Sequence, residues 1–311
     1  MTKTKKTSLL KKTTKASVIV GDLEQLSLLI NQSENPTDLE EALYLACKNG
    51  HTECAKLLVS MSKPRDNNFA LRLASQNGHI ECLKILIPLS DTRSDNALKW
   101  ASKNGHTECV ELLISVSDPK SNDSYALRLA SEYGHIECVK LLIPVSDPKD
   151  RDNQSLLLAS ENGHAECVKL LIPVSEPKAN DSESLRLSSL NGHAECIKLL
   201  IPVSDPKDRD SQALQWASEN GHTECVKLLI PVSDPKINDS RALQWAAENN
   251  HQNCVILLLP HSDISKWGEE IWEDISSDNQ QIIRSHFSRV SLEQNVLLNN
   301  KISKSKKIHK I

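Results

Sequence analysis

Long apolar runs are missing from this 311-residue sequence. No stretch approaches the ~18 consecutive apolar residues of a membrane span. The apolar run 16–20 is also shorter than the roughly 7–15 residues at the centre of a secretory signal. Nine cysteines without such a signal indicate a reducing compartment. We therefore expect an intracellular protein, located in the cytoplasm, with no membrane span.

Glycine is scarce, and its placement excludes several kinds of active site. Seven of the nine glycines stand directly before a histidine, and the other two are isolated, so the sequence contains no glycine-rich phosphate loop. The sequence also lacks a His-Glu-x-x-His helix, and no serine or cysteine is set apart from the repeated pattern as a nucleophile. The sequence predicts that the protein is not an enzyme and that it binds no cofactor.

What the sequence does contain is a short motif that recurs at a nearly constant spacing. Its copy at 161–172 reads Glu-Asn-Gly-His-Ala-Glu-Cys-Val-Lys-Leu-Leu-Ile. Successive copies are 28, 27 and then 29 residues apart, a period typical of a solenoid of stacked units. The Gly-His pairs are Gly50/His51, Gly78/His79, Gly105/His106, Gly134/His135, Gly163/His164, Gly192/His193 and Gly221/His222, and a last copy has Asn250/His251.

Charge is distributed unevenly along the chain. Residues 1–20 contain six lysines and no acid, and residues 299–311 contain five lysines and no acid. Between these tails, 26 basic residues face 41 acidic ones, a net charge of −15. Because this charge repels a phosphate backbone, we expect no nucleic acid on the repeats. The tails could contact RNA, lipid or a nuclear import receptor, although such lysine runs are usually solvated ends.

Each repeat is expected to contain two short helices joined at the Gly-His pair. Asp or Asn followed by Ser, as in Asp181-Ser182, predicts the N-cap of the first helix. The glycine, or Asn250 in the last copy, predicts the left-handed residue that ends this helix. The second helix starts at the histidine, buries an apolar face, and ends at a proline such as Pro173.

The pattern divides the chain into five predicted segments. After 263 the motif disappears, and the spacing of apolar residues fits two or three helices that cover the last apolar face of the stack. The segments are a basic disordered tail at 1–20, an N-terminal capping helix at 21–37, the repeat solenoid at 38–263, a C-terminal helical cap at 264–298 and a basic tail at 299–311.

The motif closely resembles the ankyrin repeat. The family's Gly-His-x-Glu-Val-Val-x-Leu-Leu-Leu core is matched at 163–172, with Cys167 at the first Val. The resemblance implies an all-α, ankyrin-type helix-turn-helix solenoid of about eight repeats, whose concave first-helix face binds a protein partner.

This chain departs from the ankyrin pattern in two ways. The Thr-Pro-Leu-His opening is absent, and the period is 29 rather than 33 residues. Val-Ser-Asp-Pro-Lys stands in place of the projecting β-hairpin, so we expect short turns between repeats. The shortened form resembles ankyrin proteins of mimivirus-like giant DNA viruses, and this resemblance implies a host protein as the partner.

Two positions of the first helix, six and two residues before the glycine, differ most between repeats. Tyr133, Leu157 and Leu190 are apolar where other copies are polar, and they occur in three consecutive repeats. Exposed apolar residues in a polar groove are candidate hot spots, with drift on a tolerant surface as the alternative. The predicted partner-binding residues are Arg128, Glu132, Tyr133, Leu157, Glu161, Arg186 and Leu190.

Histidine and cysteine three residues apart, as in His164 and Cys167, suggest metal ligands. A zinc ion needs four ligands at ~2.0–2.3 Å, whereas stacked helices lie roughly 8–10 Å apart. That spacing also exceeds the limit of about 7 Å between the Cα atoms of a disulfide. We therefore interpret the cysteines as small buried apolar residues, and the histidines as hydrogen-bonded to backbone over the turn. No metal is expected.

Three functions remain open. The first is a non-catalytic, monomeric protein-binding scaffold. The second is an adaptor, because Glu-Glu-Ile-Trp-Glu-Asp-Ile at 269–275 faintly resembles the opening of an F-box, which would recruit a ubiquitin ligase. The usual Leu-Pro start of that motif is missing. The third is a metal-binding or redox protein that uses the repeated His and Cys residues.

Overall fold

The computed structural model describes residues 3–32, 36–62, 67–92 and 96–308. Within these residues the regular structure consists of 20 α-helices and a few short 3-10 turns, with no strand. The predicted all-α fold is therefore confirmed. No helix in this part of the chain is both long and apolar enough to cross a membrane. The outermost residues of the two predicted tails, 1–2 and 309–311, lie outside the described residues.

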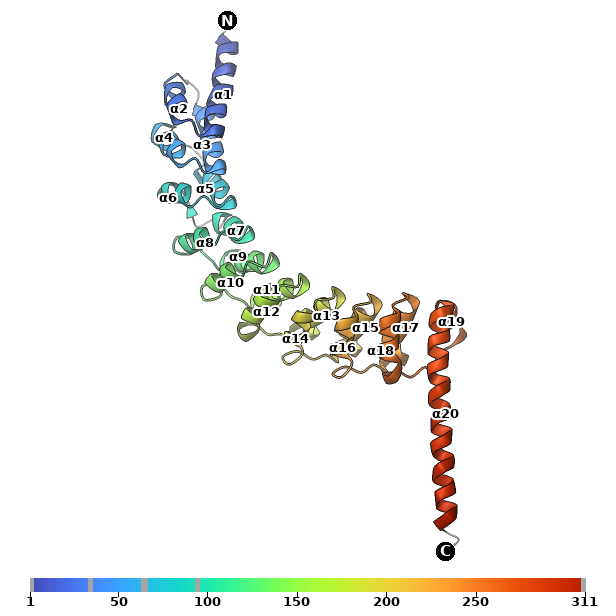
Figure 1. The fold of residues 1–311 in the computed structure, drawn as a ribbon. Coiled ribbons are helices and arrows are strands. Elements are labelled where there is room, and N and C mark those ends of the chain that lie inside the picture. The colour runs from blue at the N-terminus through green and yellow to red at the C-terminus, as the bar shows by residue number, and fades with distance from the viewer. Residues whose placement is uncertain (1–2, 33–35, 63–66, 93–95, 309–311) are drawn as a thin grey trace. The chain divides into compact units, whose positions relative to one another are not determined.

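Successive helices form pairs, and the pairs stack (Figure 1). The chain divides into two compact units, Met1–Glu176 and Pro177–Ile311. Within each unit, the first helix of a pair contacts the first helix of the next pair, and second helices contact second helices. This stacking of like elements is the ankyrin-type arrangement that the repeat period predicts.

The helix pairs are bounded as follows. In the first unit they are α1 (Lys3–Val20) with α2 (Leu23–Ile30), α3 (Pro36–Asn49) with α4 (Thr52–Ser62), α5 (Asn67–Gln76) with α6 (Ile80–Leu86), α7 (Asn96–Lys103) with α8 (Thr107–Ile114), α9 (Ser121–Glu132) with α10 (Ile136–Leu142), and α11 (Asp150–Glu161) with α12 (Ala165–Leu171). In the second unit they are α13 (Ala179–Leu190) with α14 (Ala194–Leu200), α15 (Asp208–Glu219) with α16 (Thr223–Leu229), and α17 (Ile237–Glu248) with α18 (Gln252–Leu258), followed by α19 (Glu269–Glu273) and α20 (Ser277–Ile308).

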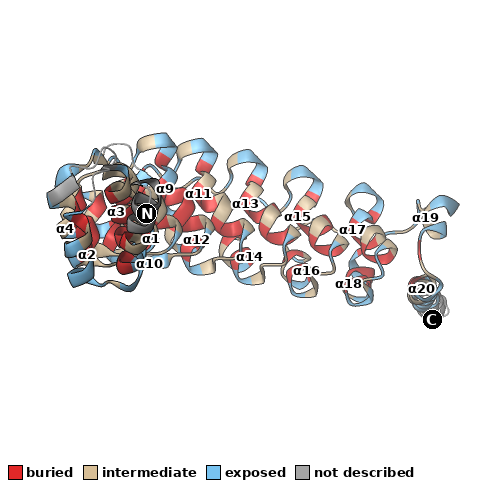
Figure 2. Ribbon diagram, turned by 90° about the horizontal axis from the view of Figure 1, so that it is seen from above, coloured by how far each residue is buried: buried red, intermediate tan, exposed pale blue. Residues whose placement is uncertain are grey.

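A thin apolar layer between first and second helices forms the core of each unit (Figure 2). In the α9–α10 pair, Leu127, Ala130, Cys138 and Leu142 are fully buried. Ala130 lies four residues before the turn glycine, where its small side chain allows the helices to approach closely. Burying each leucine contributes roughly 1.5–3 kcal/mol, and each repeat shares this gain only with its neighbours.

The Gly-His pair connects each repeat to the one before it. The Nε2–H of His135 donates to the carbonyl oxygen of Lys103 at 2.9 Å, and the same bond recurs at 2.9–3.0 Å in other repeats. Gly105 has φ +73°, and a Cβ there would lie 2.5 Å from Nδ1 of His135. The glycine is therefore required twice, by its left-handed backbone and by the ring that lies against it. The predicted backbone bond of the histidines is confirmed.

The last repeat shows why its turn can use asparagine. Asn250 has φ 61°, and no Gly-His repeat follows it. The buried Asn279 of α20 is there instead, and its Nδ2 donates to the carbonyl oxygen of Ala247 at 3.0 Å. Because the following element contributes an amide in place of an imidazole ring, this turn tolerates a side chain.

Short turns join the repeats. In Ser-Asp-Pro-Lys, the aspartate side chain accepts a hydrogen bond from the backbone N–H two residues later, as Asp147 does from Lys149 at 3.0 Å and Asp205 from Lys207 at 2.9 Å. This Asx turn reverses the chain within a few residues. The predicted replacement of β-hairpins by short turns is confirmed for the described residues.

The start of the first helix differs from the predicted N-cap in five repeats. Asn180, Asp181 and Ser182 have φ of 50°, 56° and 56°, and so form a left-handed turn that precedes the regular helix. Such residues cost roughly 1–2 kcal/mol each unless their side chains bond locally. The hydroxyl of Ser182 does not cap its own helix, because it accepts from the N–H of Asp205 at 2.8 Å and donates to Oδ2 of Asp208 at 2.6 Å. It is used to hold the next repeat.

The N-terminal segment differs from the disordered tail predicted at 1–20. Residues 3–20 form helix α1, and Gly21, 29 residues before the next turn glycine, has φ +73°. The Nε2–H of His51 donates to the carbonyl oxygen of Ile19 at 3.0 Å. Asp22 replaces the histidine and caps α2. The α1–α2 pair is thus built like a repeat, and the sequence pattern misses it because Gly21 is not followed by histidine.

Beyond the last repeat, α19 and α20 form the C-terminal segment. Ile275 and Ile283 are buried, and the indole N–H of Trp267 donates to the carbonyl oxygen of Asp239 at 2.7 Å. Helix α20 continues to Ile308, past the predicted boundary at 298.

The contact between glycine and histidine leads to a stability prediction. We expect Gly134→Ala to lower the free energy of unfolding by about 2–3 kcal/mol, because it combines a left-handed alanine with displacement of His164, whose Nδ1 would lie 2.5 Å from the new Cβ. Asn250→Ala is the control. This substitution should cost only about 1 kcal/mol, since the native Asn250 already has a Cβ. Urea denaturation would measure both, and equal costs would contradict the role of the ring.

Candidate partner-binding surface

The predicted partner-binding residues lie on or just after first helices in both units. The positions six and two residues before the glycine lie on one side of each first helix, because this spacing is close to one helical turn. Arg128 and Glu132 belong to α9, Tyr133 follows α9, and Leu157 and Glu161 belong to α11, all in the first unit, whereas Arg186 and Leu190 belong to α13 in the second unit.

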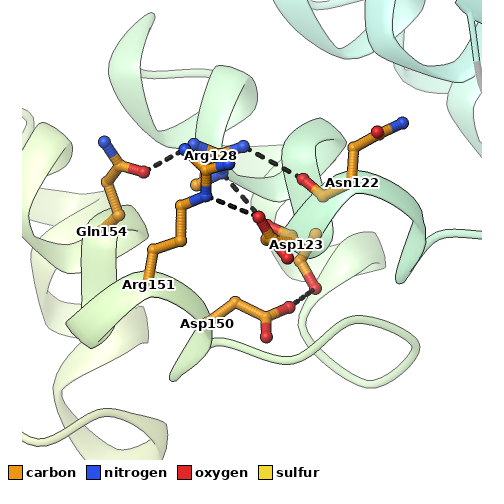
Figure 3. A network of polar contacts seen from close by, with 7 residues as sticks. Asn122, Asp123, Arg128, Asp150, Arg151 and Gln154 are labelled. Atoms are coloured by element: carbon orange, nitrogen blue, oxygen red, sulfur yellow. Dashed lines mark hydrogen bonds and ion pairs between the residues drawn. The ribbon is translucent and has the colours of Figure 1, made fainter.

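Arg128 is only 7 % exposed, although the sequence predicts it on the binding face. Its Nε–H donates to the carbonyl oxygen of Asp123 and its Nη2 to that of Asn122, both at 3.1 Å (Figure 3). Its Nη1 donates to Oε1 of Gln154 in α11 at 2.5 Å, and the guanidinium lies 4.7 Å from the ring centroid of Tyr125. Arg128 therefore connects its own left-handed turn to the next repeat, through two backbone carbonyl oxygens and the side-chain amide of Gln154.

Arg186 occupies the same place in the second unit. It is 5 % exposed, and it donates to the carbonyl oxygens of Asn180 and Asp181 at 3.0 Å and to Oε1 of Gln212 at 2.8 Å. Burial, followed by the charge of Arg209, lowers its pKa. Arg128 and Arg186, two of the seven predicted residues, thus have a structural role. Sequence spacing shows on which side of a helix a residue lies, but not how far its side chain folds back.

An ion pair and a hydroxyl complete the network between α9 and α11 (Figure 3). Nε of Arg151 lies 2.6 Å from Oδ2 of Asp123. Ser124 donates to Oδ2 of Asp150 at 2.6 Å and accepts from the backbone N–H of Asp147 at 2.8 Å. An exposed ion pair of this kind contributes about 0–1 kcal/mol, so the buried serine and arginine account for most of the stabilisation.

The same contacts join α13 to α15, and they reveal an alternation that comparison of single repeats misses. Two repeats begin Asn-Asp-Ser and contain the buried arginine (122–128, 180–186). Each precedes a repeat that begins Asp-Arg-Asp and contains the glutamine acceptor (150–154, 208–212). The signal is present in the sequence, but it appears only when every second repeat is compared.

Tyr133 is the most exposed of the predicted residues, with 43 % of its surface accessible. Other repeats have asparagine here, and its Nδ2 donates to the carbonyl oxygen four residues earlier, at 2.8 Å for both Asn104 and Asn162. A tyrosine cannot make that bond. Its ring lies nearly parallel to the His135 ring, with 6.5 Å between centroids, and Nζ of Lys103 lies 5.2 Å from its centroid.

The remaining predicted residues are half-buried. The side chains of Leu157, Leu190, Glu132 and Glu161 are neither fully exposed nor in the core. The backbone carbonyl oxygens of Glu132 and Leu190 accept the histidine bonds of the following repeats at 2.9 Å. Leu157 stands in α11 where α9 has Arg128. Its side chain has no donor for the carbonyl oxygens of its own left-handed turn.

The cysteines lie in the apolar core, and one pair differs from the rest: a hydrogen bond between the Cys47 and Cys82 thiols raises the pKa of Cys47 and lowers that of Cys82 to about 7. All nine are buried and free of disulfides. Burial, together with the nearby Glu166 carboxylate, raises the pKa of Cys167 to about 11, so it is a neutral thiol at pH 7 rather than the thiolate that binds metal. In the described part of the chain, no three His, Cys, Asp or Glu side chains are grouped as a metal ion would require.

Comparison with known proteins identifies the repeats. A family profile described as "Ankyrin repeats (3 copies)" matches residues 15–96, 71–152, 98–181 and 185–267. The first match starts within α1, in agreement with the additional helix pair at the N-terminus. No curated protein matches the chain.

The buried arginine can be tested by substitution. We expect Arg128→Leu, which copies the residue at 157, to lower the free energy of unfolding by about 1–3 kcal/mol, because the carbonyl oxygens of Asn122 and Asp123 lose their donor. Arg151→Gln removes only an exposed ion pair and should cost less than about 1 kcal/mol. Urea denaturation of both variants would check this, and a harmless Arg128→Leu would mean that Arg128 is not structural.

Proposed function

Because the chain belongs to the ankyrin-repeat family, we propose that it is a non-catalytic scaffold that binds a protein partner through the first-helix face of its repeats. Ankyrin repeats imply protein partners and are generally not catalytic. The first unit is organised for this role, since histidine, serine and arginine bonds hold its neighbouring repeats in register. A preorganised surface loses little conformational entropy on binding.

One observation supports a specific place for the contact. Tyr133 replaces an asparagine that in other repeats closes its own helix, and its ring is exposed instead. A large aromatic side chain that gives up a local hydrogen bond and remains at the surface is a good candidate for a hot spot. In the first unit, the proposed contact residues are Tyr133 and Leu157, with Glu132 and Glu161 at their border. In the second unit, Leu190 is the corresponding candidate. Arg128 and Arg186 each stabilise their own unit rather than contact the partner.

The C-terminal segment 264–298 is proposed as a cap. Asn279 donates to the carbonyl oxygen of Ala247 in the last repeat, and Ile283 is fully buried. Both support a role in covering the final apolar face. The alternative, an adaptor that recruits a ubiquitin ligase through these helices, rests only on the faint F-box resemblance at 269–275.

The origin of the protein and its location in the cell are also proposed. The shortened repeat resembles that of giant-virus ankyrin proteins, which would make the partner a host protein and the site of action the host cytoplasm. The lysine-rich ends would allow entry into the nucleus. We propose a monomer, because the partner surface lies along one chain.

Crosslinking would test the contact surface. We expect the variant Tyr133→Ser, Leu157→Gln, Leu190→Gln to lose the main protein partner that wild type crosslinks in cell lysate, because loss of hot-spot side chains costs at least about 2 kcal/mol of binding. A control with Leu28→Gln and Ile256→Gln, which changes exposed apolar residues on second helices, should keep it. An unchanged list of partners in the first variant would place the surface elsewhere.

Deleting 264–298 would separate the cap from the adaptor. As a cap, the segment should contribute to stability, so the deletion and the milder Asn279→Ala should both lower the urea midpoint. The point variant should cost about 0.5–1.5 kcal/mol through the loss of this hydrogen bond, since the carbonyl oxygen of Ala247 still accepts from the backbone N–H of Asn250. Unchanged stability together with loss of a ligase subunit from pull-downs would favour the adaptor.

A further inference from the structure

Two neighbouring first helices differ in charge from the rest of the array. Helix α5 contains Arg72, helix α7 contains Lys99 and Lys103, and neither helix contains an aspartate or glutamate. The segment between the lysine-rich ends has a net charge of −15. In α9 and α11, the position of Lys103 is occupied by Glu132 and Glu161. The positive surface is therefore local, and acidic residues mark its end.

Aromatic rings lie between these cations. The guanidinium of Arg72 lies 4.5 Å from the ring centroid of Phe69 and 6.0 Å from that of Trp100 in the next repeat. Nζ of Lys103 lies 5.3 Å from the Trp100 centroid and 5.2 Å from that of Tyr133. Cations and rings thus alternate from α5 to the end of α9, within the first unit. We call Phe69, Arg72, Trp100, Lys103 and Tyr133 the cation–aromatic surface.

These contacts fix the cations without neutralising them. A cation over an aromatic face gains about 0.5–1 kcal/mol at an exposed site, yet keeps its full charge and its hydrogen-bond donors. Among the described residues, neither Arg72 nor Lys103 takes part in a salt bridge, in contrast to Lys84 and Lys140 on the second helices, which pair with glutamates three residues earlier. Arg72 and Lys103 are held in place and half-buried, with no carboxylate on them.

We propose that the cation–aromatic surface binds an acidic segment of the protein partner, whose carboxylates accept hydrogen bonds from Arg72 and Lys103. This inference rests on the proposed scaffold function and names the chemistry of its partner. Charge complementarity supports this choice of ligand. Arg72 and Lys103 are held in position and, among the described residues, form no salt bridge. The glutamates that follow in α9 and α11 would repel an acidic segment that extended past Tyr133. The aromatic rings exclude water from the pairs and strengthen them.

A single-stranded nucleic acid fits this surface less well. Such ligands stack their bases on aromatic faces, but here Arg72 already lies over the face of Phe69, and Lys103 lies over Trp100 and Tyr133. A long polyanion would also meet the negative charge of the remaining repeats. A short acidic peptide needs only a few positive residues and avoids that repulsion.

The experiment measures binding of a labelled peptide that alternates glutamate with serine to the full chain, by fluorescence anisotropy at low salt. We expect saturable binding that weakens about tenfold or more in Arg72→Gln, Lys103→Gln, since each lost charge-assisted hydrogen bond accounts for about 1.5–3 kcal/mol before solvent screening. The control Lys84→Gln, Lys140→Gln removes the same charge from the second helices of the same unit and should leave binding within about twofold. Urea denaturation confirms that both variants are folded.

Several outcomes would overturn the proposal. These are no binding by wild type, an equal loss in the control variant, or equal or tighter binding of single-stranded oligo-dT of the same charge, which would identify a nucleic-acid surface. The crosslinking experiment on Tyr133, Leu157 and Leu190 separates this failure from failure of the scaffold function. If that variant loses its partner while the acidic peptide does not bind, the scaffold function stands and only the acidic partner class is wrong.

Discussion

The structure depends on one contact, an imidazole ring that lies against a glycine of the preceding repeat. His135 donates to the carbonyl oxygen of Lys103 while its ring fills the space that a Cβ on Gly105 would need. The bond pairs a carbonyl oxygen that the end of a helix leaves without a partner, so its loss would cost more than an exposed hydrogen bond. Because this contact recurs along each unit, it fixes the register in which first helices meet. The variable surface positions are set by that register.

A second set of contacts solves a problem that shortening the repeat creates. With no β-hairpin between repeats, the chain must return within a few residues, and it does so through an Asx turn followed by a left-handed turn. The strain in the left-handed turn is offset by Arg128, which bonds to its own turn and to Gln154 in the adjacent repeat, and by Ser124, which bonds to Asp150 in that repeat. The contacts that relieve the strain therefore also connect α9 to α11.

These two sets of contacts leave the exposed side of the first helices free to vary. The turn glycine and the histidine contact the neighbouring repeat in most copies, whereas residues such as Lys103, Glu132 and Tyr133 have few structural duties in their side chains. The surface changes from aromatic and basic in α5 and α7 to acidic beyond Tyr133. Within each unit, a fixed backbone geometry with a varied surface suits the proposed recognition of a partner, because specificity then depends on side chains and not on backbone rearrangement.

The sequence by itself determined the all-α class, the repeat period, the helix ends at glycine and proline, and the burial of the cysteines. These follow from local backbone preferences and from apolar periodicity, which a single chain displays. The tertiary structure decided what depends on neighbouring repeats. It decided that Ser182 bonds to the next repeat rather than capping its helix, that Arg128 and Arg186 fold inward, and that Gly21 belongs to an additional repeat. Asp208, which accepts from Ser182, and the glutamine partners of Arg128 and Arg186 lie 26 residues away along the chain. The carbonyl oxygens that the two arginines bind belong to left-handed turns that the sequence pattern does not predict. Helical spacing alone cannot identify such a partner.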